Sequence, residues 1–332
     1  MELFVIHLSS LIPDQPLPVD LFLKVAGRDV VFKRRGENLS GHRIEALSRH
    51  GITKFWVPEE HRPYYLLFLR EQTFTRVTPD VEWGHFIKQT TLLHVRELFL
   101  RPDISPGIEL AKDLVSSMVD RVTSDLPTTQ RLMALVNHDF YTFNHSVNVA
   151  IYAIAFARRV FGDNKETLIQ AGLGGLLHDL GKRNLGWNVI NKPGPLTKQE
   201  WAEVKRHPEY GRNALQGVQV GEEVLRVVYE HHENFDGKGY PDGRHGEEIS
   251  LLARIVAIAD VFDALTTDRS YHQALDAEGA MEKMFRMQPG KFDPKVFQSF
   301  VTNFSSRAPF VLPEGFDPCL PGALKKAAGG SK

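Results

Sequence analysis

The chain has almost no cysteine, and this limits both its chemistry and its environment. Cys319 is the only cysteine in 332 residues, so no internal disulfide can form. A single cysteine suits a reducing compartment and excludes cysteine-rich zinc sites. The sequence also has no apolar run that approaches the ~18 residues of a membrane span, and no basic N-terminal stretch followed by a long apolar core. We therefore expect a cytoplasmic protein without membrane insertion.

An excess of charge of one sign is also lacking. The 40 lysines and arginines are offset by 41 aspartates and glutamates, so the formal net charge is -1. This balance argues against a partner that is a nucleic-acid polymer or a membrane surface. The hydrophobic content of 42% and the charged content of 24% are typical of a soluble globular protein. Any anionic ligand must therefore be bound by cations placed locally.

Residues 1–72 are expected to form a small α+β module with a sensory or regulatory role. Extended runs over 21–25 and 30–32 flank a turn at Gly27, Ser40 can cap a helix that stops at Gly51, and a strand over 52–57 precedes a helix over 64–69. The segment shows no metal cluster, nucleophile arrangement or phosphate-binding glycine loop. A packing appendage without any ligand is the alternative.

Residues 73–125 are expected to be a helical connector. Leu110, Leu114, Met118 and Val122 follow one another at intervals of four and form one apolar stripe. Such a stripe is typical of a core helix, and a dimerising coiled-coil seam is the alternative, which leaves a homodimer open. Residues 305–332 are rich in proline and are predicted to be a partly disordered tail.

Residues 126–304 are predicted to be all-α, so the fold class is mostly α, a helical bundle after a small α+β N-terminal domain. A capping-box pattern at Thr197 and Glu200 marks the start of one helix. The other helices are expected over His145 to Phe156, Lys165 to Leu180, Glu222 to Asn234, Ser250 to Thr267, Ala277 to Met287 and Pro294 to Phe304.

Asp260 is the most informative residue of this region, because it lies within the apolar run from Ile255 to Phe262. An ionised carboxylate there is costly unless a cation compensates it, and a bound metal is the strongest compensation. Imidazole and carboxylate together suit iron, manganese, zinc or nickel. The candidate ligands are His145, His178, Asp179, His207, His231, His232 and Asp260.

These candidates are too many for one ion that also keeps a water ligand, so two divalent metals are the expected count. Asp179 has two carboxylate oxygens and can bridge the ions. Each histidine alone would be an ordinary surface or capping residue, and the argument rests on their combination. Two metals ~3.5–4 Å apart activate a water and stabilise the attacking and leaving oxygens of a phosphoryl transfer. The expected reaction class is hydrolysis of a phosphate ester.

Several motifs follow one another in order through residues 126 to 304. They are His178-Asp179-Leu180-Gly181-Lys182, the segments 191–197 and 205–208, His231-His232-Glu233, the loop 236–241 with Gly239-Tyr240-Pro241, the run 260–266, and the flanking segments 141–146 and 290–294. With these motifs the region resembles the HD-GYP family, a subgroup of the HD-domain metal-dependent phosphohydrolases.

The resemblance implies a phosphodiesterase that hydrolyses cyclic di-GMP to pGpG, in some members as far as GMP, through a water activated by two metals. Iron or manganese is the usual occupant. His145, His178, Asp179 and Asp260 would surround one ion and His207, His231 and His232 the other, with Asp179 bridging. Asp179 and Asp260 would orient the water, and Lys182, Tyr240, Arg269 and His272 would contact the substrate. The loop with Tyr240 would also dock cyclase-type (GGDEF) partners.

Three departures from the family pattern leave alternatives open. His272 stands where many members have arginine or lysine, Trp187 stands where the common pattern has an acid, and Tyr141 replaces a glutamate of the three-metal subset. The first two keep open a catalytically weak or inactive protein that binds cyclic di-GMP and signals through protein contacts. Hydrolysis of another cyclic dinucleotide, such as cyclic GMP-AMP, is a further alternative.

Overall fold

The computed structural model describes residues 2–74, 80–124, 142–186, 189, 192, 194–267 and 274–304. The chain divides into two compact units, residues 1–94 and 95–332, and helix α3 (Asp80–Leu100) contains the point of division. The predicted substrate contacts Arg269 and His272, the departures at Tyr141 and Trp187, and the predicted tail lie outside the described residues. The predicted division at residues 72, 125 and 304 stays a prediction.

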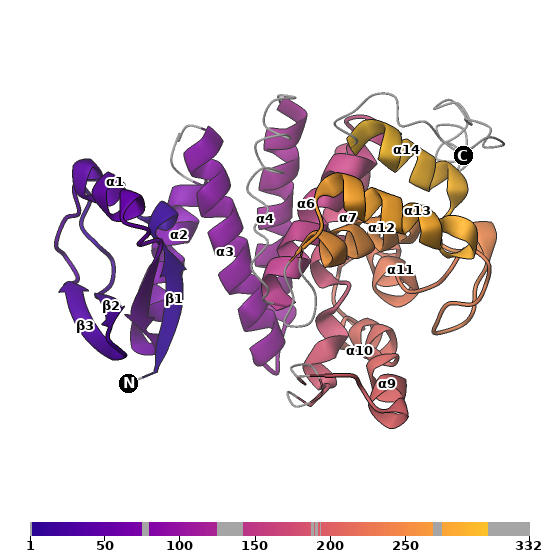
Figure 1. The fold of residues 1–332 in the computed structure, drawn as a ribbon, viewed down its shortest axis with the longest axis horizontal. Helices are drawn as coiled ribbons and strands as arrows, with labels where there is room; N and C mark the ends of the chain where they lie inside the picture. The colour runs from indigo at the N-terminus through magenta and orange to yellow at the C-terminus, as the bar shows by residue number, and fades with distance from the viewer. Residues whose placement is uncertain are drawn as a thin grey trace. The chain divides into compact units, whose positions relative to one another are not determined.

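The first unit contains a four-stranded antiparallel sheet in the order β1-β4-β2-β3 (Figure 1). The predicted hairpin is confirmed, with Gly27 at a φ of 77° in the turn. The sequence patterns missed β1, a short apolar edge strand that pairs with β4. The strands are β1 (Leu3–His7), β2 (Leu21–Val25), β3 (Arg28–Lys33) and β4 (Lys54–Pro58).

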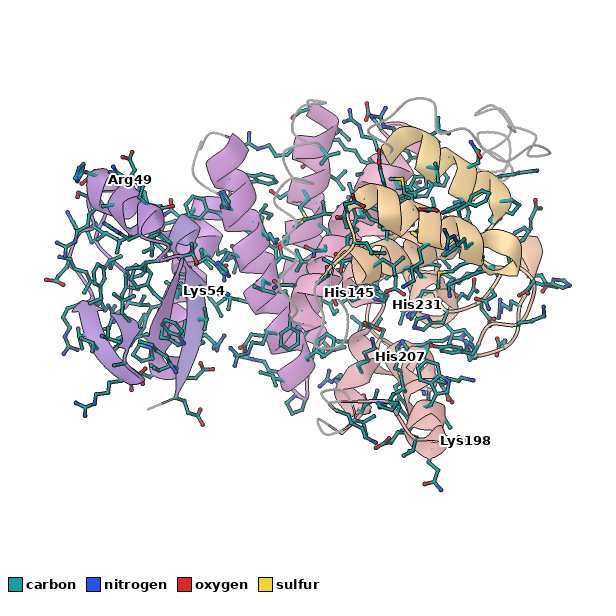
Figure 2. The ribbon with its side chains drawn as sticks, viewed as in Figure 1. Arg49, Lys54, His145, Lys198, His207 and His231 are labelled. Carbon is teal, nitrogen blue, oxygen red and sulfur yellow. The ribbon has the colours of Figure 1, made fainter. Side chains whose placement is uncertain are left out.

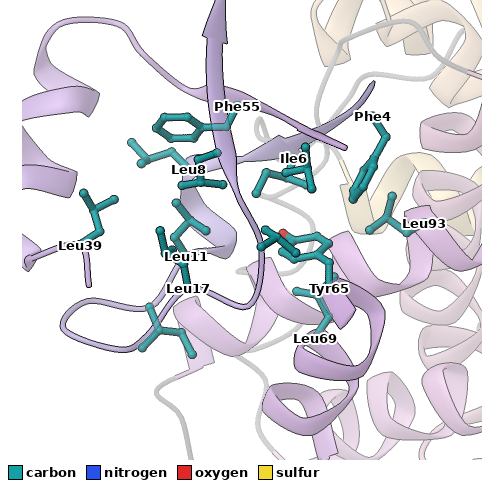
Figure 3. Close-up of a cluster of buried hydrophobic side chains, with 14 of the residues drawn as sticks. Phe4, Ile6, Leu8, Leu11, Leu17, Leu39, Phe55, Tyr65, Leu69 and Leu93 are labelled. Carbon is teal, nitrogen blue, oxygen red and sulfur yellow. The ribbon is translucent and has the colours of Figure 1, made fainter. Parts of the chain in front are cut away.

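Two helices cover this sheet and complete its core. Helix α1 (Gly41–Arg49) begins after Ser40, whose hydroxyl accepts a hydrogen bond from the Arg43 backbone N–H at 3.4 Å, as predicted. Helix α2 (Arg62–Phe74) is longer than the predicted 64–69 and buries Tyr65 and Leu69 completely. Figure 3 shows these two side chains beside the apolar residues of the strands. Short 3-10 turns occupy Leu8–Ser10 and Glu59–His61.

The second unit is all-α in the part of the chain that the structure describes, as predicted. Besides two short turns, η3 (Leu180–Asn184) and η4 (Gly246–Glu248), it contains α4 (Ser105–Ser124), α6 (Thr142–Phe161), α7 (Lys165–Leu177), α9 (Lys198–Val204), α10 (His207–Ala214), α11 (Glu222–Glu230), α12 (Leu251–Thr266), α13 (Ala277–Lys291) and α14 (Pro294–Phe304) (Figure 1).

The apolar stripe of α4 packs inside this unit. Leu114, Met118 and Val122 are buried, and α4 contacts α7. The stripe is therefore part of the core, and a homodimer gains no support from it.

Helix α7 lies at the centre of the unit because its glycines let neighbouring helices approach closely. A Cβ on Gly175 would lie 2.9 Å from the Cα of Ala150 in α6, and one on Gly174 would lie 2.7 Å from the Val227 side chain in α11. Interiors packed at this density do not absorb an added methyl group without a shift. The packing therefore fixes the C-terminal end of α7, where His178 follows.

Four predicted helix ends are wrong. Helices α6 and α13 continue past the predicted Phe156 and Met287 to Phe161 and Lys291, whereas α7 and α11 end earlier than predicted. Helix α7 ends at Leu177 rather than Leu180, because His178 turns its ring nitrogen Nδ1 back to the carbonyl of Gly175 and the chain then tightens into η3. Helix α11 ends at Glu230 rather than Asn234, so His231 and His232 follow the helix. Among the described residues no helix is both long and apolar enough to cross a bilayer.

Candidate metal centre

All seven predicted ligands meet where several helices of the second unit begin or end. His145 lies in the first turn of α6, His178 caps α7, His207 starts α10, and Asp260 lies in α12, while Asp179, His231 and His232 follow helix ends. Figure 2 labels His145, His207 and His231, which come from three different elements. A packed helix positions the side chain at its end, and the turn that follows the helix lets the next side chain point towards the same centre.

The ligand atoms form two adjoining clusters. One contains His145, His178 and Asp260, and the other contains Asp179, His207, His231 and His232. Within each cluster the candidate donor atoms lie within 4.8 Å of one another. This spacing is compact enough for one ion in each cluster.

Asp179 connects the two clusters through its two carboxylate oxygens. Its Oδ2 lies 3.4 Å from Nε2 of His178, and its Oδ1 lies 3.2 Å from Nε2 of His207. Lys182 donates a hydrogen bond to Oδ2 at 2.6 Å. The carboxylate is almost fully buried and has lost its contact with water. The ammonium group of Lys182 compensates its negative charge.

Four of the histidines have their ring tautomer set by the hydrogen bond of Nδ1. In His178, His207 and His231 this nitrogen donates to the carbonyl three residues earlier, at 2.7 to 2.9 Å. In His145 it donates to Oδ2 of Asp263 at 2.7 Å. The lone pair of Nε2 then points into the centre, which is the tautomer that metal-binding histidines need.

Several of these donor atoms have no protein hydrogen-bond partner although they are buried. Nε2 of His178 and Oδ1 of Asp179 are of this kind, and Nε2 of His207 faces Nε2 of His231 at 3.1 Å. Two imidazole lone pairs that face each other are unfavourable unless a cation lies between them. The residues present therefore fit two bound metal ions.

The pKa shifts agree with this charge arrangement. Burial, with the neighbouring imidazoles, lowers the pKa of His231 far below its usual value, and burial lowers the pKa of His232 to about 3. Burial alone would raise the pKa of Asp179 and of Asp260, but Lys182 and His178 lower the pKa of Asp179 well below the ordinary range, and His145 does the same for Asp260. Burial opposes the imidazolium of His145, but the hydrogen bonds and charges of Asp260 and Asp263 outweigh it and raise its pKa to about 9, so a metal ion that binds Nε2 must displace a proton from this ring.

Asp263 is a site residue that the sequence analysis missed. It is fully buried in α12, three residues after Asp260, and it also accepts a hydrogen bond from the Asn148 side chain at 2.9 Å. The carboxylate orients the His145 ring towards Asp260, 3.0 Å away. Its signal was the spacing of three within a buried helix, which places it on the same face as Asp260.

The loop after α11 places Tyr240 over the centre. The Tyr240 backbone N–H donates to the carbonyl of His232 at 3.2 Å, and the two rings lie 4.8 Å apart. The base of the loop is fixed from a distant segment, because the backbone N–H groups of Phe235 and Asp236 donate to the carbonyls of Lys291 and Gly290. Burial and the nearby carboxylates raise the pKa of Tyr240, so its hydroxyl stays protonated.

Comparison with known proteins decides the family. A family model described as the HD domain matches residues 127–296. The chain belongs to the HD-domain family. Phosphodiesterases of this family are metal-dependent, in agreement with the clusters of histidine and aspartate.

The HD domain of this chain is similar to several curated phosphodiesterases. It is 43% identical over 193 residues to the cyclic di-GMP phosphodiesterase PA4108 of Pseudomonas aeruginosa, which covers 58% of this chain and 46% of the relative. It is 36% identical to the 3'3'-cGAMP-specific phosphodiesterase 3 of Vibrio cholerae, over 47% of this chain and 34% of the relative. The chain thus spans less than half the length of either relative.

A solved structure supports the fold over most of the chain. The protein Bd1817 of Bdellovibrio bacteriovorus, described as an HDG"Y"P protein, covers 90% of this chain and 98% of its own length, with a TM-score of 0.67 and 21% identity. At this identity the similarity concerns the fold alone. The family model and the curated relatives confirm the predicted resemblance to HD-domain phosphodiesterases.

Proposed function

We propose that this chain is a metal-dependent phosphodiesterase that hydrolyses cyclic di-GMP to pGpG, with GMP as a further product. The observation that carries the proposal is the pair of adjoining donor clusters that Asp179 connects. In these clusters Nε2 of His178 is buried without a hydrogen-bond partner, and Nε2 of His207 faces Nε2 of His231 at 3.1 Å. The similarity to the Pseudomonas phosphodiesterase supports the choice of substrate.

We assign the seven clustered side chains as ligands of two divalent ions. His145, His178 and Asp260 would hold one ion, His207, His231 and His232 the other, and Asp179 both. Nitrogen and oxygen donors without thiolate suit iron, manganese, zinc or nickel, and the resemblance to the HD-GYP family favours iron or manganese. When bound, such ions activate a water and stabilise charge on a phosphate.

The remaining residues of the centre would bind and orient the substrate. Lys182, a quarter exposed and 2.6 Å from Asp179, can donate to a phosphate oxygen from the same position. Tyr240 would cover the substrate with a protonated hydroxyl. Asp260 and Asp179 would accept hydrogen bonds from the attacking water and so orient it. Contacts of Arg269 and His272 with phosphate stay predictions from the sequence.

The test is release of pGpG and GMP from cyclic di-GMP by anaerobically prepared protein that is reconstituted with iron or manganese, after its bound metal has been quantified. We expect turnover with about two metals per chain, the count of a shared two-metal site. Asp179→Ala should lose both metal and turnover, while Asp113→Ala, a change at an exposed residue of α4, should keep them. Full activity of Asp179→Ala would refute the proposal.

A second substrate follows from the relatives. Because one of them is described as specific for 3'3'-cGAMP, both cyclic dinucleotides should be compared side by side. Tight binding of cyclic di-GMP without turnover, in protein shown to contain metal, would instead indicate a signalling receptor. Docking of a GGDEF partner on the loop around Tyr240 is a further proposal, as is a cytoplasmic location, which rests on the single cysteine.

A further inference from the structure

A series of aromatic and cationic side chains leads from the metal centre to an exposed indole. The ring of Tyr240 lies 4.8 Å from the ring of His232, and the ammonium group of Lys205 lies 5.7 Å from the Tyr240 ring. The same ammonium group lies 5.9 Å from the ring of Trp201, which is 46% exposed. Each step is shorter than 6 Å, so the series is continuous from a metal ligand to solvent.

The Trp201 end of this series is held in place. Trp201 belongs to α9, whose first turn is fixed by a reciprocal capping box between Thr197 and Glu200. Lys192 forms an ion pair with the same Glu200 at 2.6 Å. A short helix with a satisfied N-terminus presents its side chains in a defined direction, although it is too short to be stable alone.

Lys205 differs from the arginine that follows it. Arg206 is paired with Glu203 at 3.4 Å and lies near Glu209 at 3.9 Å. Within the described parts of the chain no carboxylate lies within ion-pair distance of Lys205, whose interactions are with two aromatic rings. An exposed ammonium group without a carboxylate is available to an anionic group of a ligand.

We propose that Trp201 and Lys205 form the subsite that determines specificity for a purine dinucleotide. The inference rests on the proposed function. With the scissile phosphate at the metal centre, Lys205 would contact the phosphate that is not cleaved, and a purine base would stack on the exposed face of the Trp201 indole. Stacking of a base on an aromatic side chain contributes about 1–3 kcal/mol. A simple phosphodiester without a base lacks this contact.

Steady-state kinetics of the metal-loaded full chain test the subsite. Trp201→Ala should raise KM for cyclic di-GMP by about 10- to 100-fold, the range that loss of one stacked base implies. The rise in KM should exceed any fall in kcat, and it should exceed the change in KM for bis(4-nitrophenyl) phosphate, a diester without a nucleobase. Trp201→Phe should restore most of the affinity, because a phenyl ring still stacks.

The lysine and its neighbour provide a matched pair. Lys205→Met should raise KM for cyclic di-GMP and reduce its dependence on salt, because an exposed charge contact is screened by ions. Arg206→Met, which removes the adjacent and already paired cation, should leave both unchanged. Equal effects of the two variants would overturn the assignment of Lys205, and an unchanged KM in Trp201→Ala would overturn that of Trp201.

A binding measurement separates failure of this subsite from failure of the proposed function. If the wild-type chain hydrolyses neither diester, cyclic di-GMP is titrated against the tryptophan fluorescence of the wild-type chain and of Trp201→Phe. Quenching that saturates in the wild type and is lost in the variant would support the subsite in a protein that is not a hydrolase. Identical quenching in both, or none in either, would overturn the subsite.

Discussion

Gly181→Ala is expected to disrupt the metal centre although the residue offers no ligand. Gly181 is buried in η3, and a Cβ at this position would overlap the carbonyl oxygen of His207 and the backbone nitrogen of Gly211, both in α10. These are backbone atoms, which cannot rotate away as a flexible side chain would. Helix α10 must therefore move from η3, and it takes His207 with it.

The geometry gives the size of the effect. Real Cβ atoms essentially never approach another heavy atom within 3.0 Å, so relief of the overlap needs a displacement of roughly 1 Å, a misplacement that can cost about 100-fold in rate. This displacement of α10 would lengthen the 3.2 Å separation between Nε2 of His207 and Oδ1 of Asp179. Overpacking of this kind costs about 1–3 kcal/mol or more, which lowers the unfolding temperature by roughly 2–12 °C.

The assay combines bound metal per chain, thermal unfolding and turnover of cyclic di-GMP. Gly186→Ala is the matched control, because an added Cβ there meets no heavy atom within 4 Å and the backbone does not require glycine. The control should equal the wild type in all three measurements. If Gly181→Ala also bound the same metal and unfolded at the same temperature, the close approach of η3 and α10 would not be what fixes His207.

Three further changes test other parts of the molecule. Asp263→Asn should weaken metal affinity by about 10- to 100-fold, because His145 loses its charged acceptor. A competition titration with a chelating dye measures this affinity. An effect no larger than that of Asp113→Asn would contradict the role of Asp263. Thr197→Ala should cost about 1 kcal/mol by removing the cap of α9, seen in chemical unfolding. Leu69→Ala should lower the free energy of unfolding of the first unit by about 2–5 kcal/mol, while the metal bound by the second unit stays constant. Loss of metal would refute the independence of the two units.

Much of the site could be predicted from the sequence, because histidines and aspartates that can bind a metal are recognisable by their residue type whatever path the chain takes. His178, Asp179 and Asp260 could be recognised from a charged residue in an apolar run and from ordered motifs, and the structure brings them together. Their role as ligands stays a prediction. The fold class was also predictable, since helical periodicity and caps such as Ser40 are local signals that the structure confirms.

Three of the misses depend on contacts between distant parts of the chain. Strand β1 is only five residues long and forms because β4 supplies its hydrogen bonds. Helix α11 ends at Glu230, and the His231 ring that follows it lies against His207 of another helix, a contact that no local signal reports. Asp263 was not recognised because its partner His145 is far away in the sequence.

The loop that carries Tyr240 donates two backbone hydrogen bonds to the carbonyls of Gly290 and Lys291, at the C-terminal end of α13. On a ribosome these acceptors emerge well after the loop itself, so the loop cannot complete its pairing while the chain is still short. Such non-local contacts form late in folding. A shortened protein that stops before Gly290 would contain every proposed ligand yet leave the base of this loop without its two acceptors. The loop that carries Tyr240 would thus be the last part of the domain to complete its folding.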